Sequence, residues 1–68
     1  MDIWFKIFSD NVKKYRISKK LNKTALATLV GCDVSYIGKI ERGEKYPNLS
    51  MIFKIVKALE IEPKDLFQ

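Results

Sequence analysis

The sequence contains no histidine and only one cysteine, Cys32, among its 68 residues. A single thiol cannot form a disulfide within the chain, and without an imidazole beside it the thiol cannot complete a metal-ligand set. We therefore expect no metal and no cofactor, and one unpaired cysteine fits a reducing compartment. We expect Cys32 to be a packed thiol, and a redox sensor is the alternative.

The sequence also lacks the features of membrane, secreted and catalytic proteins. It has no apolar run near the ~18 residues that a membrane span requires, and its start, MDIWFKIFSD, has no apolar stretch followed by small residues, as a signal peptide would. We therefore expect a cytoplasmic protein. Because the chain has no histidine, no metal-ligand set, no glycine loop for phosphate and little volume for a pocket, we do not expect an enzyme.

Glycine and proline are scarce, at three and two residues, and repeats and linker-like stretches are absent. The chain is therefore expected to form one domain, residues 1–68, without a second core. A chain of this length buries only ~60% of its unfolded surface, so dimerisation is the expected supplement to its stability. The hydrophobic content of 47% is high enough for folding.

Positive charge is concentrated in the centre of the chain. The formal net charge is +5, yet residues 13–45 contain nine basic and three acidic side chains and so carry +6. A central basic segment indicates a polyanionic partner such as nucleic acid. A solvated lysine-rich face is the alternative interpretation.

Apolar residues recur at three- and four-residue spacing, which predicts an all-α fold, and no segment alternates with period two. The predicted helices end near Lys19 or Lys20, at Val30 and at about Arg42, and a short last helix starts at Glu62-Pro63. Residues that favour helix N-termini precede the first four helices: Asp2, Asn22, Asp33 and Asn48. The residues expected to face inward from the fourth helix are Leu49, Ile52, Phe53, Ile55, Val56 and Leu59.

Residues 23–42 have the layout of a helix-turn-helix: a helix of about eight residues, a three-residue turn from Gly31 and a second helix. Ala27 is small where two helices cross closely, and Gly31 allows the positive φ of a tight turn. Gly38 costs the second helix about 1 kcal/mol relative to alanine. We expect Gly38 to lie beside the buried side and to allow close approach to DNA or a neighbouring helix, or simply to be tolerated. Apolar residues mark the packed sides of both helices: Leu26, Val30, Cys32, Ile37 and Ile40.

The segment LNKTALATLVGCDVSYIGKIERGEKYPNLSMIFKIVKALEIEPKDLF, with its IERG and its closing Pro-x-x-Leu, resembles the helix-turn-helix family of the Cro and C1 phage repressors. The chain is also similar to the small controller proteins of restriction–modification systems. The resemblance implies a compact five-helix, lambda-repressor-like domain whose third helix enters the DNA major groove. It further implies a transcriptional regulator that binds double-stranded DNA as a homodimer on an inverted-repeat operator, without a small-molecule effector.

The resemblance implies that three side chains of the third helix read bases: Val34, Ser35 and Lys39. Val34 suits a thymine methyl group, Ser35 suits several base edges, and Lys39 suits guanine O6 and N7. Alternatively, Val34 packs within the protein and Lys39 contacts phosphate. The family often has glutamine at the position of Val34. Because valine stands there instead, the bases read at this position do not follow from the resemblance.

The resemblance also implies contacts to the DNA backbone from residues around the helix-turn-helix. Lys23 begins the second helix, whose N-terminus offers amide donors to a phosphate. The hydroxyl of Tyr36 can reach a phosphate oxygen from the edge of the third helix. The remaining candidates follow this helix: Arg42, Lys45 and Tyr46. For each of these residues, an ordinary solvated surface position is the alternative.

Glu41 follows Ile37 by one helical turn and therefore points inward, where an unpaired carboxylate would be costly. The resemblance implies an arginine partner on the first helix, and the matching residue is Arg16. We interpret Arg16 and Glu41 as a structural ion pair that holds the first helix against the recognition helix, not as a catalytic couple.

We expect no oligomerisation domain after the predicted bundle, and we therefore expect any dimer surface to come from the bundle itself. Ile61, Leu66 and Phe67 supply more apolar surface than so short a helix can bury, and Trp4 with Phe5 forms the competing patch. Two other functions are the alternatives to a DNA-binding regulator. One is an antitoxin-like protein-interaction module with a vestigial helix-turn-helix, and the other is a membrane-surface peptide built on the first helix.

Overall fold

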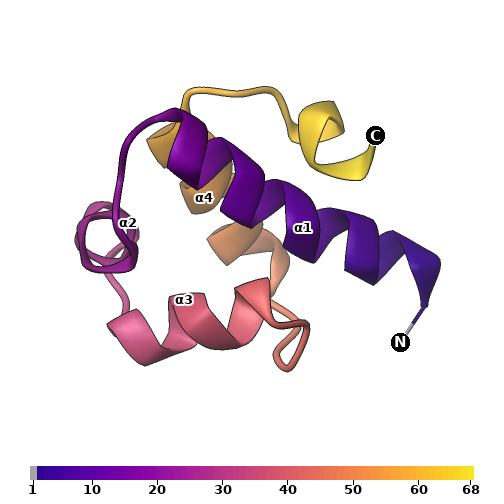
Figure 1. Cartoon of the computed structure of the whole chain (residues 1–68), viewed down its shortest axis with the longest axis horizontal. Helices are drawn as coiled ribbons and strands as arrows, with labels where there is room; N and C mark the ends of the chain where they lie inside the picture. Colours follow the sequence, from indigo (N-terminus) through magenta and orange to yellow (C-terminus); the bar gives the residue numbers. More distant parts are fainter. Residues whose placement is uncertain (1) are drawn as a thin grey trace.

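The protein, in a computed structural model that describes residues 2–68, consists of four α-helices followed by a 3₁₀-helix (Figure 1). The elements in chain order are α1 (Ile3–Ser18), α2 (Lys23–Val30), α3 (Val34–Glu41), α4 (Leu49–Leu59) and η1 (Pro63–Phe67). No strand occurs between residues 2 and 68, so the all-α prediction is confirmed. The predicted fifth helix is present as a 3₁₀-helix and not as an α-helix.

All four predicted N-caps are formed. The side-chain oxygens of these residues accept hydrogen bonds from backbone N–H groups in the first helical turn, which satisfies donors that have no partner within the helix. The pairs are Asp2 with Phe5 (2.9 Å), Asn22 with Ala25 (2.7 Å), Asp33 with Ser35 (3.1 Å) and Asn48 with Met51 (2.8 Å). α2 ends at Val30 as predicted. α1 and α3 end slightly earlier than predicted, with Lys19 and Arg42 as their C-caps.

The longest helix, α1, crosses the molecule, with α2 and α3 on one side of it and η1 packed along it (Figure 1). Every element contributes to a single apolar core, so the helix-turn-helix is held by the rest of the domain. None of the described helices is long and apolar enough to span a membrane. The core side chains are Phe5, Phe8, Val12, Leu26, Ala27, Val30, Ile37, Ile40, Ile55, Val56, Leu59 and Leu66.

The inward face predicted for α4 is partly wrong. Ile55 and Leu59 are fully buried as expected, but Leu49 is 66% exposed and Phe53 is 52% exposed. Residues four apart lie on the same side of a helix, so Leu49 and Phe53 form one apolar patch away from the core. The spacing could not separate the two sides, because α4 is apolar around most of its circumference.

The prediction that Leu66 supplies dimer surface is also wrong. Leu66 is fully buried, and its backbone carbonyl accepts a hydrogen bond from Asn11 Nδ2 at 3.0 Å. Phe67 stacks against Phe8 with ring centroids 5.7 Å apart and remains 40% exposed. Ile61 is half-buried against the core. The C-terminal segment therefore packs inward more than its length suggested, because α1 offers it both an amide donor and an aromatic ring.

Arg16 and Glu41 form the expected ion pair between α1 and α3. Arg16 Nε donates to Glu41 Oε2 at 2.6 Å, and Arg16 Nη2 donates to Glu41 Oε1 at 3.1 Å. Arg16 Nη1 also donates to the Leu21 carbonyl at 2.9 Å. Both charged side chains are more than 90% buried. The two-point geometry and the added carbonyl contact offset the cost of removing these charges from water.

We predict that Glu41→Gln lowers the free energy of unfolding by about 3–5 kcal/mol, because it leaves the Arg16 guanidinium buried without a counter-charge. Denaturant titration followed by circular dichroism measures this change. Asp10→Asn is the control, since it removes the exposed pair with Lys6 (3.0 Å) and should cost less than about 1 kcal/mol. Equal stability of Glu41→Gln and the parent protein would show that the pair is not structural.

Candidate nucleic-acid interface

The turn between α2 and α3 has the geometry that the sequence predicted. Gly31 adopts φ +76°, and no atom beyond its chain neighbours lies within 4 Å of the place where a Cβ would stand. Glycine is therefore favoured here because of the left-handed backbone and not because a side chain would lack space. The Ala27 carbonyl accepts hydrogen bonds from Gly31 N at 2.9 Å and from Cys32 N at 3.0 Å. These bonds end α2 and fix the tight turn after it. α3 then begins at Val34, two residues after Cys32.

α3 presents one side to the core and another to solvent. Ile37 and Ile40 are fully buried, as predicted. The three predicted base-reading residues lie on the exposed side. Val34 is 41% exposed, and Ser35 and Lys39 are also exposed. Val34 belongs neither to the core nor to the residues packed against it, which disfavours the alternative that it packs within the protein.

The residues predicted to contact the DNA backbone differ in how exposed they are. Lys23 is exposed at the first position of α2, and Lys45 is exposed in the segment after α3. Tyr36 is half-buried and packs against the core. Tyr46 stacks on Phe5, with ring centroids 3.8 Å apart, although it remains 63% exposed. The structure thus ties the segment after α3 to the start of α1 through an aromatic contact that the sequence did not indicate.

Arg42 forms an ion pair with Glu44 that was not predicted from the sequence. Arg42 Nε donates to Glu44 Oε2 at 2.8 Å, and Arg42 Nη2 donates to Glu44 Oε1 at 3.4 Å. This hydrogen-bonded pair raises the pKa of Arg42 and lowers the pKa of Glu44. Opposite charges two residues apart were the only signal in the sequence, and at that spacing they meet only if the backbone turns between them.

The position predicted for Gly38 is wrong. Gly38 is buried, and the group that covers it is the guanidinium of Arg42, neither a neighbouring helix nor an open surface. A Cβ at this position would stand 3.0 Å from Arg42 Nη1. The two residues are four apart on α3, so the arginine side chain folds back along the helix over the glycine.

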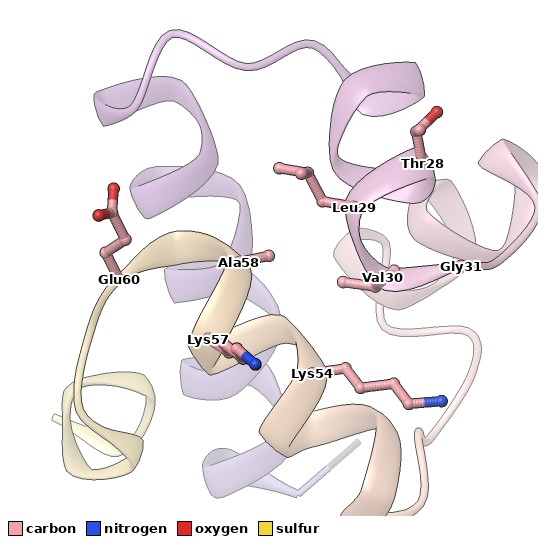
Figure 2. Close-up of a pocket in the computed structure, with 8 residues that line it drawn as sticks. All are labelled: Thr28, Leu29, Val30, Gly31, Lys54, Lys57, Ala58 and Glu60. Atoms are coloured by element: carbon pink, nitrogen blue, oxygen red, sulfur yellow. The ribbon is translucent and has the colours of Figure 1, made fainter.

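An open groove between α2 and α4 is a second surface that the sequence did not indicate (Figure 2). Leu29 projects across it toward Ala58 and is 60% exposed, and Lys54 extends beneath Val30. The groove lies at the C-terminal ends of both helices, whereas the candidate base-reading residues belong to α3. Its lining residues are Thr28, Leu29, Val30, Gly31, Lys54, Lys57, Ala58 and Glu60.

Cys32, in the turn, is half-buried against the core. Burial, and then the negative charge of Asp33, raises the pKa of the Cys32 thiol. A raised pKa leaves less thiolate at a given pH, and the thiolate is the reactive form.

We therefore predict that Cys32 is modified more slowly by a disulfide reagent in the folded protein than in the unfolded chain at pH 8. The rate, followed against pH, should rise at higher pH in the folded protein. The same protein in guanidinium chloride is the control. A folded-state profile that coincides with the unfolded one would contradict the prediction.

Residues 12–66 match the helix-turn-helix family, and the chain belongs to this family, in its Cro/C1 type. Its class is therefore that of the helix-turn-helix DNA-binding regulators. Among solved structures, the chain is similar to the restriction–modification controller protein C.AhdI from Aeromonas hydrophila. The two are 40% identical with a TM-score of 0.88, over 93% of this chain and 96% of that one. The controller protein C.Esp1396I is 27% identical, with a TM-score of 0.88 over 98% of this chain and 86% of that one.

Curated relatives come from the same class. The control protein C.BamHI of Bacillus amyloliquefaciens is 40% identical over 62 residues, which are 88% of this chain and 75% of that protein. The control protein C.SmaI of Serratia marcescens is 38% identical over 53 residues, which are 78% of this chain and 63% of that protein.

Proposed function

We propose that the protein is a sequence-specific transcriptional regulator of the restriction–modification controller type and that it binds double-stranded DNA as a homodimer. The observation that carries the proposal is the division of α3 into a buried side, fixed by Arg16 and Glu41, and an exposed side with Val34, Ser35 and Lys39. Such a helix fits the major groove, which is wide enough to admit an α-helix. The similarity to controller proteins over almost the whole chain supports the same function.

Each exposed side chain of α3 has a distinct chemistry for base recognition. Val34 would contact a thymine methyl group, and Lys39 would donate to guanine O6 and N7. The Ser35 hydroxyl can donate and accept, so it suits several base edges. Lys23 and Lys45 would contact phosphates on either side of α3, where contacts fix orientation and carry no direct sequence information.

In vitro selection of duplex DNA, followed by sequencing of the bound pool, tests the proposal directly. The expected result is an enriched motif, bound with an affinity that falls linearly with salt on a log–log plot. The slope should be about −0.9 for each phosphate neutralised. A pool that remains random after selection would contradict sequence-specific binding.

We predict that Lys39→Ala costs about 1–3 kcal/mol of binding free energy on the selected site and relaxes sequence preference at one position. Lys23→Ala is the matched control, because it removes the same charge from a phosphate-contacting position and should weaken selected and random duplexes alike. Fluorescence anisotropy with both duplexes gives the comparison. Equal losses on both duplexes for Lys39→Ala would assign Lys39 to the backbone contacts.

The second copy of the chain would dock on the apolar patch of α4. Because Leu66 and Phe5 are buried, the C-terminal and N-terminal surfaces are reduced to Ile61 with Phe67 and to Trp4 with its neighbours. Leu49 and Phe53 are both more than half exposed, on one side of one helix. This helix follows α3 after the segment 42–48.

We predict that Phe53→Asp is monomeric in sedimentation equilibrium at concentrations where the parent protein is dimeric. Phe67→Asp should stay dimeric, and Trp4→Asp serves as a second comparison. A two-fold dimer would also place half-sites ~10 base pairs apart, centre to centre, in an inverted repeat. A monomeric Phe67→Asp beside a dimeric Phe53→Asp would place the interface at the C-terminal end instead.

A protein-interaction module is the second candidate function, and the groove between α2 and α4 is the observation that favours it. An exposed leucine beside two lysines would suit an acidic partner with an apolar anchor. The two functions separate in one measurement, because an interaction module would bind duplex DNA without sequence preference or not at all.

A further inference from the structure

We propose that Glu44 and Gly38 together position the guanidinium of Arg42, so that Glu44 determines how selectively this arginine meets a DNA phosphate. The inference rests on the proposed function, since it takes α3 to be the helix that contacts DNA. It assigns roles to two residues, one acidic and one without a side chain, that offer no favourable contact to DNA by themselves.

Gly38 provides the space in which the guanidinium lies. A Cβ added at Gly38 would stand 3.0 Å from Arg42 Nη1, 3.8 Å from Arg42 Cζ and 3.9 Å from Arg42 Nη2. The guanidinium therefore lies directly against the place where an alanine methyl group would be, and only Nη1 is closer to it than an ordinary van der Waals contact. An alanine here would improve the intrinsic helix propensity, but Arg42 Nη1 would have to shift by a few tenths of an ångström and so leave its present position over the helix.

Glu44 fixes the orientation of that head group. Its two oxygens meet Nε and Nη2 of Arg42, which is the side-on edge of the guanidinium. Glu44 is itself held by its backbone, because Glu44 N donates to the Lys39 carbonyl at 2.8 Å and the preceding Gly43 adopts φ +75°. The chain thus turns directly after α3 and returns the carboxylate to the arginine two residues before it.

The pair leaves part of the guanidinium available. Of its five N–H groups, two are used by Glu44, and the other three, on Nη1 and Nη2, have no hydrogen-bond acceptor within residues 2–68. A phosphate can therefore bind at the free edge without displacing Glu44. Because the guanidinium is planar, fixing one edge also fixes the direction in which the other edge donates.

Glu44 has two consequences for DNA binding. Its negative charge lowers the affinity for any phosphate backbone near Arg42, whatever the sequence. Glu44 also holds the guanidinium in one place, so only a duplex whose phosphate lies at the free edge gains hydrogen bonds from Arg42. The first consequence lowers both affinities alike, and the second raises the ratio of affinity for the selected site to affinity for random DNA.

The test measures that ratio for Glu44→Gln, with Asp10→Asn as the matched control. Both variants remove one carboxylate from an exposed ion pair, but Asp10 lies on α1 and pairs with Lys6. We expect Glu44→Gln to bind random duplex more tightly and to lower the ratio by roughly two- to five-fold, the range that one exposed ion pair supports. Asp10→Asn should leave the ratio unchanged.

A double-mutant cycle tests the role of Gly38. Gly38→Ala should lower the ratio in the parent protein and leave it unchanged in an Arg42→Ala background, where no guanidinium remains to be displaced. Thermal unfolding followed by circular dichroism confirms that each variant is folded. A glycine needed only for helix packing would have the same effect in both backgrounds, and that result would overturn the assignment.

The remaining outcomes separate this inference from the proposed function. If the parent protein selects a DNA motif and Glu44→Gln behaves like Asp10→Asn, the positioning role is overturned and the regulator function stands. If the parent protein selects no motif, the proposed function itself fails, whatever the two variants do.

Discussion

The contact between Arg16 and Glu41 is the constraint on which the orientation of the recognition helix depends. α3 has eight residues, too few to be stable alone in water, so its geometry comes from what it packs against. Apolar contacts of Ile37 and Ile40 hold the helix but are not directional. Two hydrogen bonds between a guanidinium and both oxygens of a carboxylate are directional. They fix the rotation of α3 about its own axis, and therefore which of its residues face solvent.

The parts of the fold that follow from short-range rules could be predicted from the sequence. The four N-caps, the left-handed Gly31 and the inward position of Glu41 each depend on a few neighbouring residues, and each is present. The faces of α4 and the burial of Leu66 could not be predicted. α4 is apolar on every side except the one that carries Ser50, Lys54 and Lys57, so only its packing decides that Phe53 is exposed while Ile55 is buried. Leu66 is buried because α1 supplies partners that are more than fifty residues away in the chain.

The candidate site shows the same division. The resemblance to the Cro and C1 repressors implied a role for Val34, Ser35 and Lys39, and the regular period of α3 predicted that they lie opposite its inner side, which Glu41 marks. Arg42 was predicted to be a surface cation. Its ion pair with Glu44 was not predicted, because that contact requires the backbone turn at Gly43. The role of Gly38 was missed for a related reason. Its neighbour is a flexible side chain on the same helix, and periodicity says nothing about where such a side chain rests.

The separation of the two sides of α3 has a consequence for how proteins of this kind can diverge. Apart from the half-buried Tyr36, residues that hold the domain together and residues that face solvent are separate on this helix: Ile37, Ile40 and Glu41 are buried, and Val34, Ser35 and Lys39 are exposed. Substitutions at exposed sites away from such structural contacts usually change stability little. The exposed positions can therefore vary through many intermediates that all remain folded. A lineage built on this bundle could change its preferred DNA sequence without first acquiring stabilising mutations.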